Sequence, residues 1–203
     1  MNNCQDSCRW QFGLLCSVAL YCVQLAPALG QNPVGELEHH HESNSPPASG
    51  VLDEIDVNFT LLGADGAVVT DEDFRGAHLL LGFGFTRCTD VCPIMVANMA
   101  RTISQVGDGL AGVFVSVDTE RDSPSTVEAY AKVFHERVSG LSGSIEQINA
   151  AARNFRISYV VTKSQNSYTV QHTSHVFLID PDGQLIDVFA MNTDPAIIAA
   201  AME

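Results

Sequence analysis

The chain has 203 residues, and removing an N-terminal leader and tether leaves about 150, enough for one sizeable core and too few for two ordinary domains. The formal net charge of -14 argues against a nucleic-acid partner, because phosphate binding requires clustered Lys and Arg. Of the six cysteines, four lie within the first 22 residues, so the rest of the chain holds a single pair, Cys88 and Cys92.

The first 30 residues have the pattern of an export leader. An apolar run over residues 12–23 follows Arg9, and small residues at 28–30 match the spacing that signal peptidase recognises. The sequence predicts a signal peptide over 1–30, with an uncleaved membrane anchor through residues 12–29 as the alternative. In both cases the following domain is exported, and is periplasmic or membrane-anchored facing the periplasm.

Residues 31–50 are polar, contain two adjacent prolines and show no apolar period, which predicts a flexible tether. The tether carries a run of three histidines, His39 to His41. We interpret this run as a solvated segment with incidental metal affinity rather than a metal-collecting tail. Residues 51–203 are then the folded domain.

Within this domain, apolar periodicity and turn residues predict alternating strands and helices. Helix starts are indicated by Pro93, by Ser123-Pro124 together with a capping box of Ser125 with Glu128, and by another capping box of Ser144 with Gln147. In chain order we expect strands at 57–62, 67–70 and 78–85, a helix at 93–106, a strand at 113–118, helices from 125 to about 138 and from 145 to 155, strands at 157–162, 175–179 and 184–190, and a short final helix from 195.

This order predicts an α/β domain. The strand–helix–strand unit over 78–118 implies a parallel pair, and the closing hairpin over 175–190 adds antiparallel strands. The result is a mixed central sheet flanked by helices, as in a thioredoxin-like fold, with an added N-terminal β-hairpin over 57–70.

Cys88 and Cys92 lie between a buried strand and the start of a helix. The helix dipole and unpaired backbone N–H groups at such a position favour thiolate over thiol, which makes both sulfurs good nucleophiles or good metal ligands. Residues four apart on a helical path share a face, so both sulfurs can point to one place. A structural disulfide and a metal site remain alternatives at this stage.

A third ligand is needed because two thiolates leave a metal ion under-coordinated. In a thioredoxin fold, the segment before the strand at 175–179 lies beside the cysteine loop, and it contains His172 and His175. These histidines differ by three positions, so in extended chain they face opposite ways and we favour His172. Soft sulfur selects Cu(I), and an added imidazole also allows Cu(II).

For the other candidate residues near the cysteines we favour structural roles or leave the role open. Met95 and Met99 are four apart on an apolar helix face and are expected in the core rather than as thioether ligands. Asp90 either caps the helix or tunes the thiolates. Asp118 and residues 120–122 are expected to shape a loop beside the site.

Several segments together resemble the Sco/SenC family of copper chaperones. They span nearly the whole domain, from about residue 59 to 190, and are FGFTRCTDVCP at 83–93, VSVDTERDSP at 115–124, FH at 134–135, GLSGS at 140–144 and HTSHVFLIDPDG at 172–183. The resemblance implies a thioredoxin-like fold with Cys88, Cys92 and His172 as copper ligands. Departures are Gln171, where the family usually has an acidic residue, and Thr89, where proline is frequent.

The resemblance implies a metallochaperone that binds one copper ion and delivers it to the copper site of a respiratory cytochrome oxidase. Expected partners are the copper-receiving oxidase subunit and a thioredoxin-type dithiol reductase, because the pair must be reduced before it can bind metal. The alternative is an enzyme, a thiol-disulfide oxidoreductase that uses Cys88 and Cys92 as a redox pair to reduce the cysteines of the oxidase copper site.

Overall fold

The computed structural model describes residues 54–203. The predicted leader over 1–30, the tether over 31–50 with its histidine run, and the first residues of the predicted domain lie outside the described residues. Among the helices of residues 54–203, none is both long and apolar enough to cross a membrane.

The centre of residues 54–203 is a five-stranded mixed sheet with the order β5-β4-β3-β8-β9. Its parallel half joins β3 (His78–Gly84), β4 (Leu110–Ser116) and β5 (Val138–Leu141). Its antiparallel half joins β3 to β8 (His175–Ile179), and β8 to β9 (Leu185–Ala190). The predicted mixed sheet is confirmed, and β3 is at its middle.

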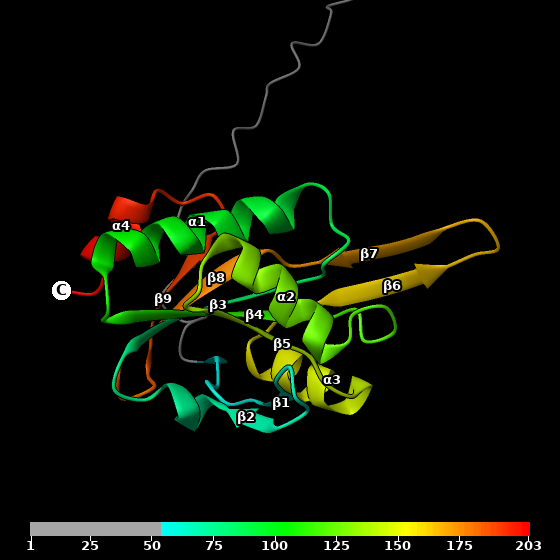
Figure 1. Cartoon of the computed structure of the whole chain (residues 1–203), viewed down its shortest axis with the longest axis horizontal. Coiled ribbons are helices and arrows are strands. Elements are labelled where there is room, and N and C mark those ends of the chain that lie inside the picture. The colour runs from blue at the N-terminus through cyan, green and yellow to red at the C-terminus, as the bar shows by residue number, and fades with distance from the viewer. Residues whose placement is uncertain (1–53) are drawn as a thin grey trace, which may run out of the picture. The chain divides into compact units, whose positions relative to one another are not determined.

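Helices cover both faces of this sheet (Figure 1). One face packs against α1 (Val91–Val106), α2 (Pro124–Phe134) and α4 (Pro195–Ala200). The other face packs against α3 (Ile145–Asn154) and the small N-terminal hairpin. That hairpin pairs β1 (Thr60–Leu62) with β2 (Val68–Thr70), is followed by the short 3-10 helix η2 (Asp71–Phe74), and confirms the predicted addition.

Side chains of β3 alternate between the two cores, as they must in a strand buried on both faces. Leu79, Leu81 and Phe83 face the α3 side, and Leu80 faces α1. The next two positions on the α1 side are Gly82 and Gly84, which leave room for Met95 and for Cys92 respectively. The absence of side chains here therefore brings the start of α1 down onto β3.

The region after α2 differs from the expectation. We predicted a helix to about residue 138, but α2 ends at Phe134, His135 is extended, and Val138 begins β5. The helix begins where the Ser123-Pro124 signal predicts: Ser123, two residues before the predicted capping box at Ser125, is the N-cap and accepts from the Thr126 N–H, and Pro124 is the first helical residue. The Glu128 carboxylate does not cap the helix, since it accepts the Gly140 N–H of β5 at 2.5 Å.

A second hairpin also differs from the expectation. The strand predicted at 157–162 is present as β6 (Tyr159–Lys163), but its partner β7 (Tyr168–His172) was not predicted. These two strands form a separate antiparallel sheet and project beyond the central sheet (Figure 1). His172 is therefore the last residue of a strand, rather than part of a loop.

Candidate metal centre

Cys88 and Cys92 are at the end of β3 and the start of α1. The helix begins at Val91, two residues before Pro93, so Cys92 is already in its first turn. Proline is accepted at this position because first-turn N–H groups have no partner inside the helix. Cys92 is fully buried and Cys88 is partly buried, and both are unbridged thiols. The Cys92 N–H points at the Cys88 sulfur, with N···S 3.4 Å.

The loop that carries Cys88 is tied to the body of the domain by a buried carboxylate. Asp122 is 1% exposed and accepts from the Thr86 N–H at 2.7 Å and from the Thr86 hydroxyl at 2.6 Å. The Ser116 hydroxyl donates a third bond at 2.6 Å. Since charge-assisted hydrogen bonds are among the stronger ones, this contact holds the loop two residues before Cys88.

His172 reaches this loop from β7. Its Nε2 atom lies 3.4 Å from the Cys92 sulfur, and its Nδ1 atom lies 2.9 Å from the Thr173 carbonyl oxygen. A carbonyl only accepts, so Nδ1 carries the proton and the Nε2 lone pair of the neutral ring faces the sulfur. The edge of the ring packs against Phe85, with centroids 5.8 Å apart. The favoured histidine is thus the one beside the cysteines.

The two sulfurs have opposite electrostatic surroundings. Burial alone would raise the pKa of the Cys88 thiol, but backbone N–H groups of Cys92, Asp90 and Val91, with the Cys92 thiol, together lower it below its usual value. Burial, and the hydrogen bond with Cys88, raise the pKa of Cys92 well above its usual value. Burial lowers the pKa of His172, which favours the neutral ring.

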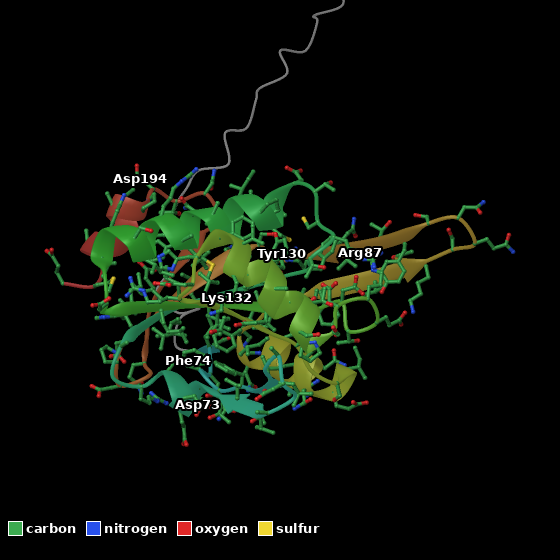
Figure 2. The ribbon with its side chains drawn as sticks, viewed as in Figure 1. Asp73, Phe74, Arg87, Tyr130, Lys132 and Asp194 are labelled. Atoms are coloured by element: carbon green, nitrogen blue, oxygen red, sulfur yellow. The ribbon has the colours of Figure 1, made fainter. Side chains whose placement is uncertain are left out.

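The side chains of the other residues considered from the sequence lie at the surface or in the core. His175 is exposed at the start of β8, and Asp90 is exposed with no side-chain capping bond. Met95 and Met99 are core residues, as predicted. Arg87, next to Cys88, is exposed on the loop leading into α1 (Figure 2).

Cys88, Cys92 and His172 lie near one another but do not form a preformed metal site. Among residues 54–203, no three His, Cys, Asp or Glu side chains are gathered in the arrangement of a preformed metal site. The donor set nevertheless suits a soft ion, with two sulfurs and one imidazole lone pair on converging segments.

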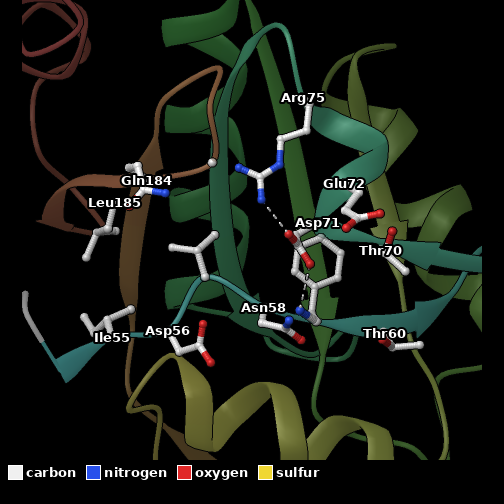
Figure 3. A pocket seen from close by; sticks show the side chains of 13 residues that line it. Ile55, Asp56, Asn58, Thr60, Thr70, Asp71, Glu72, Arg75, Gln184 and Leu185 are labelled. Atoms are coloured by element: carbon white, nitrogen blue, oxygen red, sulfur yellow. Dashed lines mark hydrogen bonds and ion pairs between the residues drawn. The ribbon is translucent and has the colours of Figure 1, made fainter.

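A cavity of about 550 Å³ lies elsewhere, between residues 55–60 and the turn before β9. Figure 3 shows Arg75 paired there with Asp71, whose carboxylate also accepts from the Phe59 N–H. The residues that line the cavity include neither cysteine nor histidine, and three of them are carboxylates, Asp56, Asp71 and Glu72. It is not part of the candidate centre.

Two tyrosines, one near the cysteines and one on the strand that carries His172, were not singled out from the sequence. Tyr130 of α2 packs on Phe114, with centroids 5.2 Å apart, and its buried hydroxyl has no hydrogen-bond partner within the described residues. Burial, and the charges of Cys92 and Cys88, raise its pKa. Tyr168 of β7 donates to Asp118 at 2.7 Å. The alternating pattern YTVQH, which ends in His172, could have placed Tyr168 on a strand with that histidine. Nothing in the α2 sequence marked Tyr130 as a neighbour of the cysteines.

These features define a class of protein, a thioredoxin-like α/β domain in which a helix-start thiol pair faces a histidine. The sequence profile of the SCO1/SenC family matches residues 48–203. The chain therefore belongs to the SCO1/SenC family, and the resemblance noted from its motifs is confirmed.

Curated relatives match at moderate identity. The chain is 35% identical over 152 residues to Protein sco1 of Schizosaccharomyces pombe, covering 71% of this chain and 58% of that protein. It spans about half the length of the curated relatives it matches. Several of these relatives are named as mitochondrial proteins, and one solved relative is named as a lipoprotein.

Solved structures show the same fold. Arabidopsis thaliana ScoI with copper bound superposes with a TM-score of 0.65 at 33% identity, covering 70% of this chain and 92% of that one. BsSco, described as having a disulfide switch and as a member of the Sco family of cytochrome c oxidase assembly proteins, superposes with a TM-score of 0.57 at 26% identity. That match covers 73% of this chain and 92% of BsSco.

Proposed function

We propose that this chain is a copper metallochaperone that binds one copper ion through Cys88, Cys92 and His172 and delivers it to the copper site of a respiratory cytochrome oxidase. The observation that carries the proposal is the 3.4 Å contact between the Cys92 sulfur and the Nε2 atom of His172, a residue 80 positions away. Copper-bound relatives of the same fold, and a relative described as an oxidase assembly protein, support the choice of cargo and recipient.

Each donor has a defined part in holding the ion. The bond from Nδ1 to the Thr173 carbonyl fixes the ring orientation and leaves Nε2 as the donor atom. The two cysteines supply soft sulfur, which becomes thiolate as the metal displaces the proton of each thiol and which favours Cu(I), and the imidazole also admits Cu(II). Delivery requires no turnover, since a recipient can replace the three ligands one at a time.

The test is a copper titration of the fully reduced protein, with Cys88→Ser, Cys92→Ser and His172→Ala prepared in parallel. His175→Ala is the matched control, because His175 is three residues away and exposed. We expect one tight copper ion in the parent and the control, and loss of tight binding in the other three. The histidine run at 39–41 is common to all five proteins, so its own affinity cancels in the comparison. Unchanged affinity in His172→Ala would refute the proposed ligand set.

The second candidate function is thiol-disulfide exchange with the oxidase, favoured by the unequal surroundings of the two cysteines. Cys88 is partly exposed and has the lowered pKa, which suits a nucleophile, and Cys92 is buried beside it. In this reaction Cys88 and Cys92 would be oxidised to a disulfide while a disulfide of the recipient is reduced to two thiols. Reductase activity that survives His172→Ala, together with loose copper binding, would favour this function.

The proposed setting follows from the N-terminal sequence. We propose a leader or membrane anchor within residues 1–30, a tether over 31–50, and a domain over 51–203 that faces the periplasm. In that oxidising compartment a thioredoxin-type dithiol reductase is the expected partner that keeps Cys88 and Cys92 reduced. Mass measurement of the N-terminus of the exported protein distinguishes a cleaved leader from a retained anchor.

A further inference from the structure

The loop of residues 117–123, between β4 and α2, contains two buried carboxylates, Asp118 and Asp122. Each is 1% exposed, although a carboxylate is rarely buried unless it is paired or hydrogen-bonded. We refer to residues 117–123 as the bracket loop. The partners of its two carboxylates lie in different parts of the chain: Thr86 is two residues before Cys88, and Tyr168 is on the same strand as His172.

Asp122 holds the cysteine side. It accepts from the Thr86 N–H at 2.7 Å and from the Thr86 hydroxyl at 2.6 Å, two residues before Cys88. Within the described residues, these two bonds and the one from Ser116 account for its side-chain hydrogen bonds. Asp122 therefore fixes where the chain leaves β3 and turns toward Cys88.

Asp118 holds the histidine side. It accepts from the Tyr168 hydroxyl at 2.7 Å and forms an ion pair with Arg121. The Arg121 guanidinium in turn lies 3.7 Å from the centre of the Tyr168 ring. Tyr168 and His172 are the first and last residues of β7, four positions apart and on the same side of the strand. A fixed Tyr168 therefore sets the position of His172 about 13 Å along the strand.

This anchor matters because the β6–β7 hairpin is not part of the central sheet. Its strands pair with each other, so no ladder hydrogen bonds from the central sheet hold β7, and the side-chain contacts of Val170 with the core and of Tyr168 with Asp118 have to hold it. The two carboxylates are also linked to each other. The Ser116 hydroxyl donates to Asp122 at 2.6 Å and accepts from the Asp118 N–H at 3.2 Å.

We infer that the bracket loop positions both halves of the copper site, with Asp122 acting on the cysteines through Thr86 and Asp118 acting on His172 through Tyr168. The inference rests on the proposed function for its ligand set. Asp118, Asp122 and Tyr168 are positioning residues, because none of them is among the proposed ligands. Substituting residues that orient metal ligands typically weakens metal binding about 10-fold to 100-fold.

The test uses two conservative variants of the full chain, Tyr168→Phe and Asp122→Asn, with copper as the probe. Tyr168→Phe removes one hydroxyl and keeps the ring under Arg121. It is expected to weaken copper binding about 10-fold and to change the imidazole nitrogen hyperfine signal of bound Cu(II), while the thiolate-to-copper charge-transfer band stays. Asp122→Asn should do the reverse, shifting the charge-transfer band and leaving the nitrogen signal. A general loss of stability would not produce this crossed pattern.

Lys163→Gln is the matched control. Lys163 is on the same hairpin and pairs with Glu120 of the same loop, but both side chains are at least half exposed. The Lys163 ammonium also lies over the Tyr168 ring, 5.7 Å from its centre, but exposed charge contacts of both kinds contribute little and the Tyr168 bond to Asp118 is kept, so affinity and both spectral signals should match the parent. A loss in Lys163→Gln as large as that in Tyr168→Phe would overturn the inference.

A readout without metal separates this inference from the proposed function. Nitrogen NMR of the reduced, metal-free protein should show a shifted His172 ring in Tyr168→Phe and an unchanged one in Lys163→Gln. If Tyr168→Phe binds copper within twofold of the parent, or leaves the His172 ring signals unmoved, the positioning role of the bracket loop is refuted while the proposed ligand set stands. A parent protein that does not bind copper refutes the proposed function, and the NMR result then still decides the positioning role. If Tyr168→Phe does not fold, Asp118→Asn carries the same expectation for His172.

Discussion

Replacing Gly84 by alanine tests the close packing of α1 on β3. An added Cβ atom at this position would lie 2.9 Å from the Cys92 sulfur and 2.6 and 2.9 Å from two ring carbons of Phe114. Contacts this short are not tolerated, and both neighbours are fully buried. Either the ring or the sulfur has to move, and the sulfur is the atom that contacts His172 at 3.4 Å.

Overpacking of a core by one methyl group costs about 1–3 kcal/mol, so we expect the free energy of unfolding to fall by about that amount. Denaturant unfolding of the reduced protein, extrapolated to water, measures the change. We also expect weaker copper binding in the same variant, because displacement of the Cys92 sulfur disturbs the proposed ligand set. Copper titration of the variant, at denaturant-free conditions where it is folded, measures the second effect.

Gly82→Ala is the matched control, because Gly82 is on the same strand and the same face. Its Cβ would meet Met95 at 3.0 Å from Cε and 3.1 Å from Sδ, which belong to the end of a flexible side chain. We expect a loss of less than about 1 kcal/mol and unchanged copper affinity. Equal effects of the two substitutions, or a Gly84→Ala protein that binds copper like the parent, would refute the packing argument.

Three further predictions concern single side chains. Gly140→Ala should cost at least about 3 kcal/mol, because its Cβ would fall on the backbone carbonyl of Val127, which cannot rotate away, and denaturant unfolding measures this. Tyr130→Phe should be neutral or stabilising by about 1 kcal/mol, because it removes a buried hydroxyl that has no partner within the described residues, as thermal unfolding would show. Burial and the bond to Asp118 raise the pKa of Tyr168 to about 12, so its contribution to stability should be complete below pH about 10 and lost as pH rises through about 12.

Contrary outcomes are equally specific. A well-folded Gly140→Ala protein of parental stability would mean that β5 and α2 can separate at little cost. A loss above about 1 kcal/mol in Tyr130→Phe would mean that the hydroxyl has an acceptor in solution. For Tyr168, the parent and Tyr168→Phe are titrated by the absorbance of tyrosinate, and the ionisation missing from the variant should be one near pH 12. If the missing ionisation is near the ordinary value of about 10, the prediction is contradicted.

The central sheet, and the residues that lie together at the candidate metal centre, could be predicted from the sequence. Buried strands at the positions of β3 and β8 have continuous apolar runs, and the cysteines follow the first of them directly. The histidine was harder to assign, because its choice over His175 depended on strand alternation and on the resemblance. Its place beside Cys92 agrees with that choice.

The end of α2 could not be predicted because tertiary contacts terminate the helix. Residues 134–138 contain no glycine or proline to mark a boundary. Instead, the Arg137 guanidinium bonds the carbonyl oxygens of Gly107 and Ile103 at the end of α1. Those contacts draw the chain out of the helix and toward β5, and they join residues about 30 positions apart.

The β7 strand was missed for a related reason. It is short, alternates polar and apolar residues, and buries only Val170 fully. Its turn, residues 164–167, has no glycine, so the usual hairpin signal is absent. What holds the strand is the contact of Tyr168 with Asp118, 50 positions earlier in the chain, and local pattern carries no information about such a pair.

The unequal exposure of the two sulfurs imposes a direction on any exchange at this pair. Cys88 is partly exposed, whereas Cys92 is fully buried in the core on the α1 side, with its sulfur against the ring of His172. In the proposed handover, an incoming donor atom from another protein would therefore meet the Cys88 sulfur before the Cys92 sulfur, so the partly exposed thiol would be exchanged before the buried one.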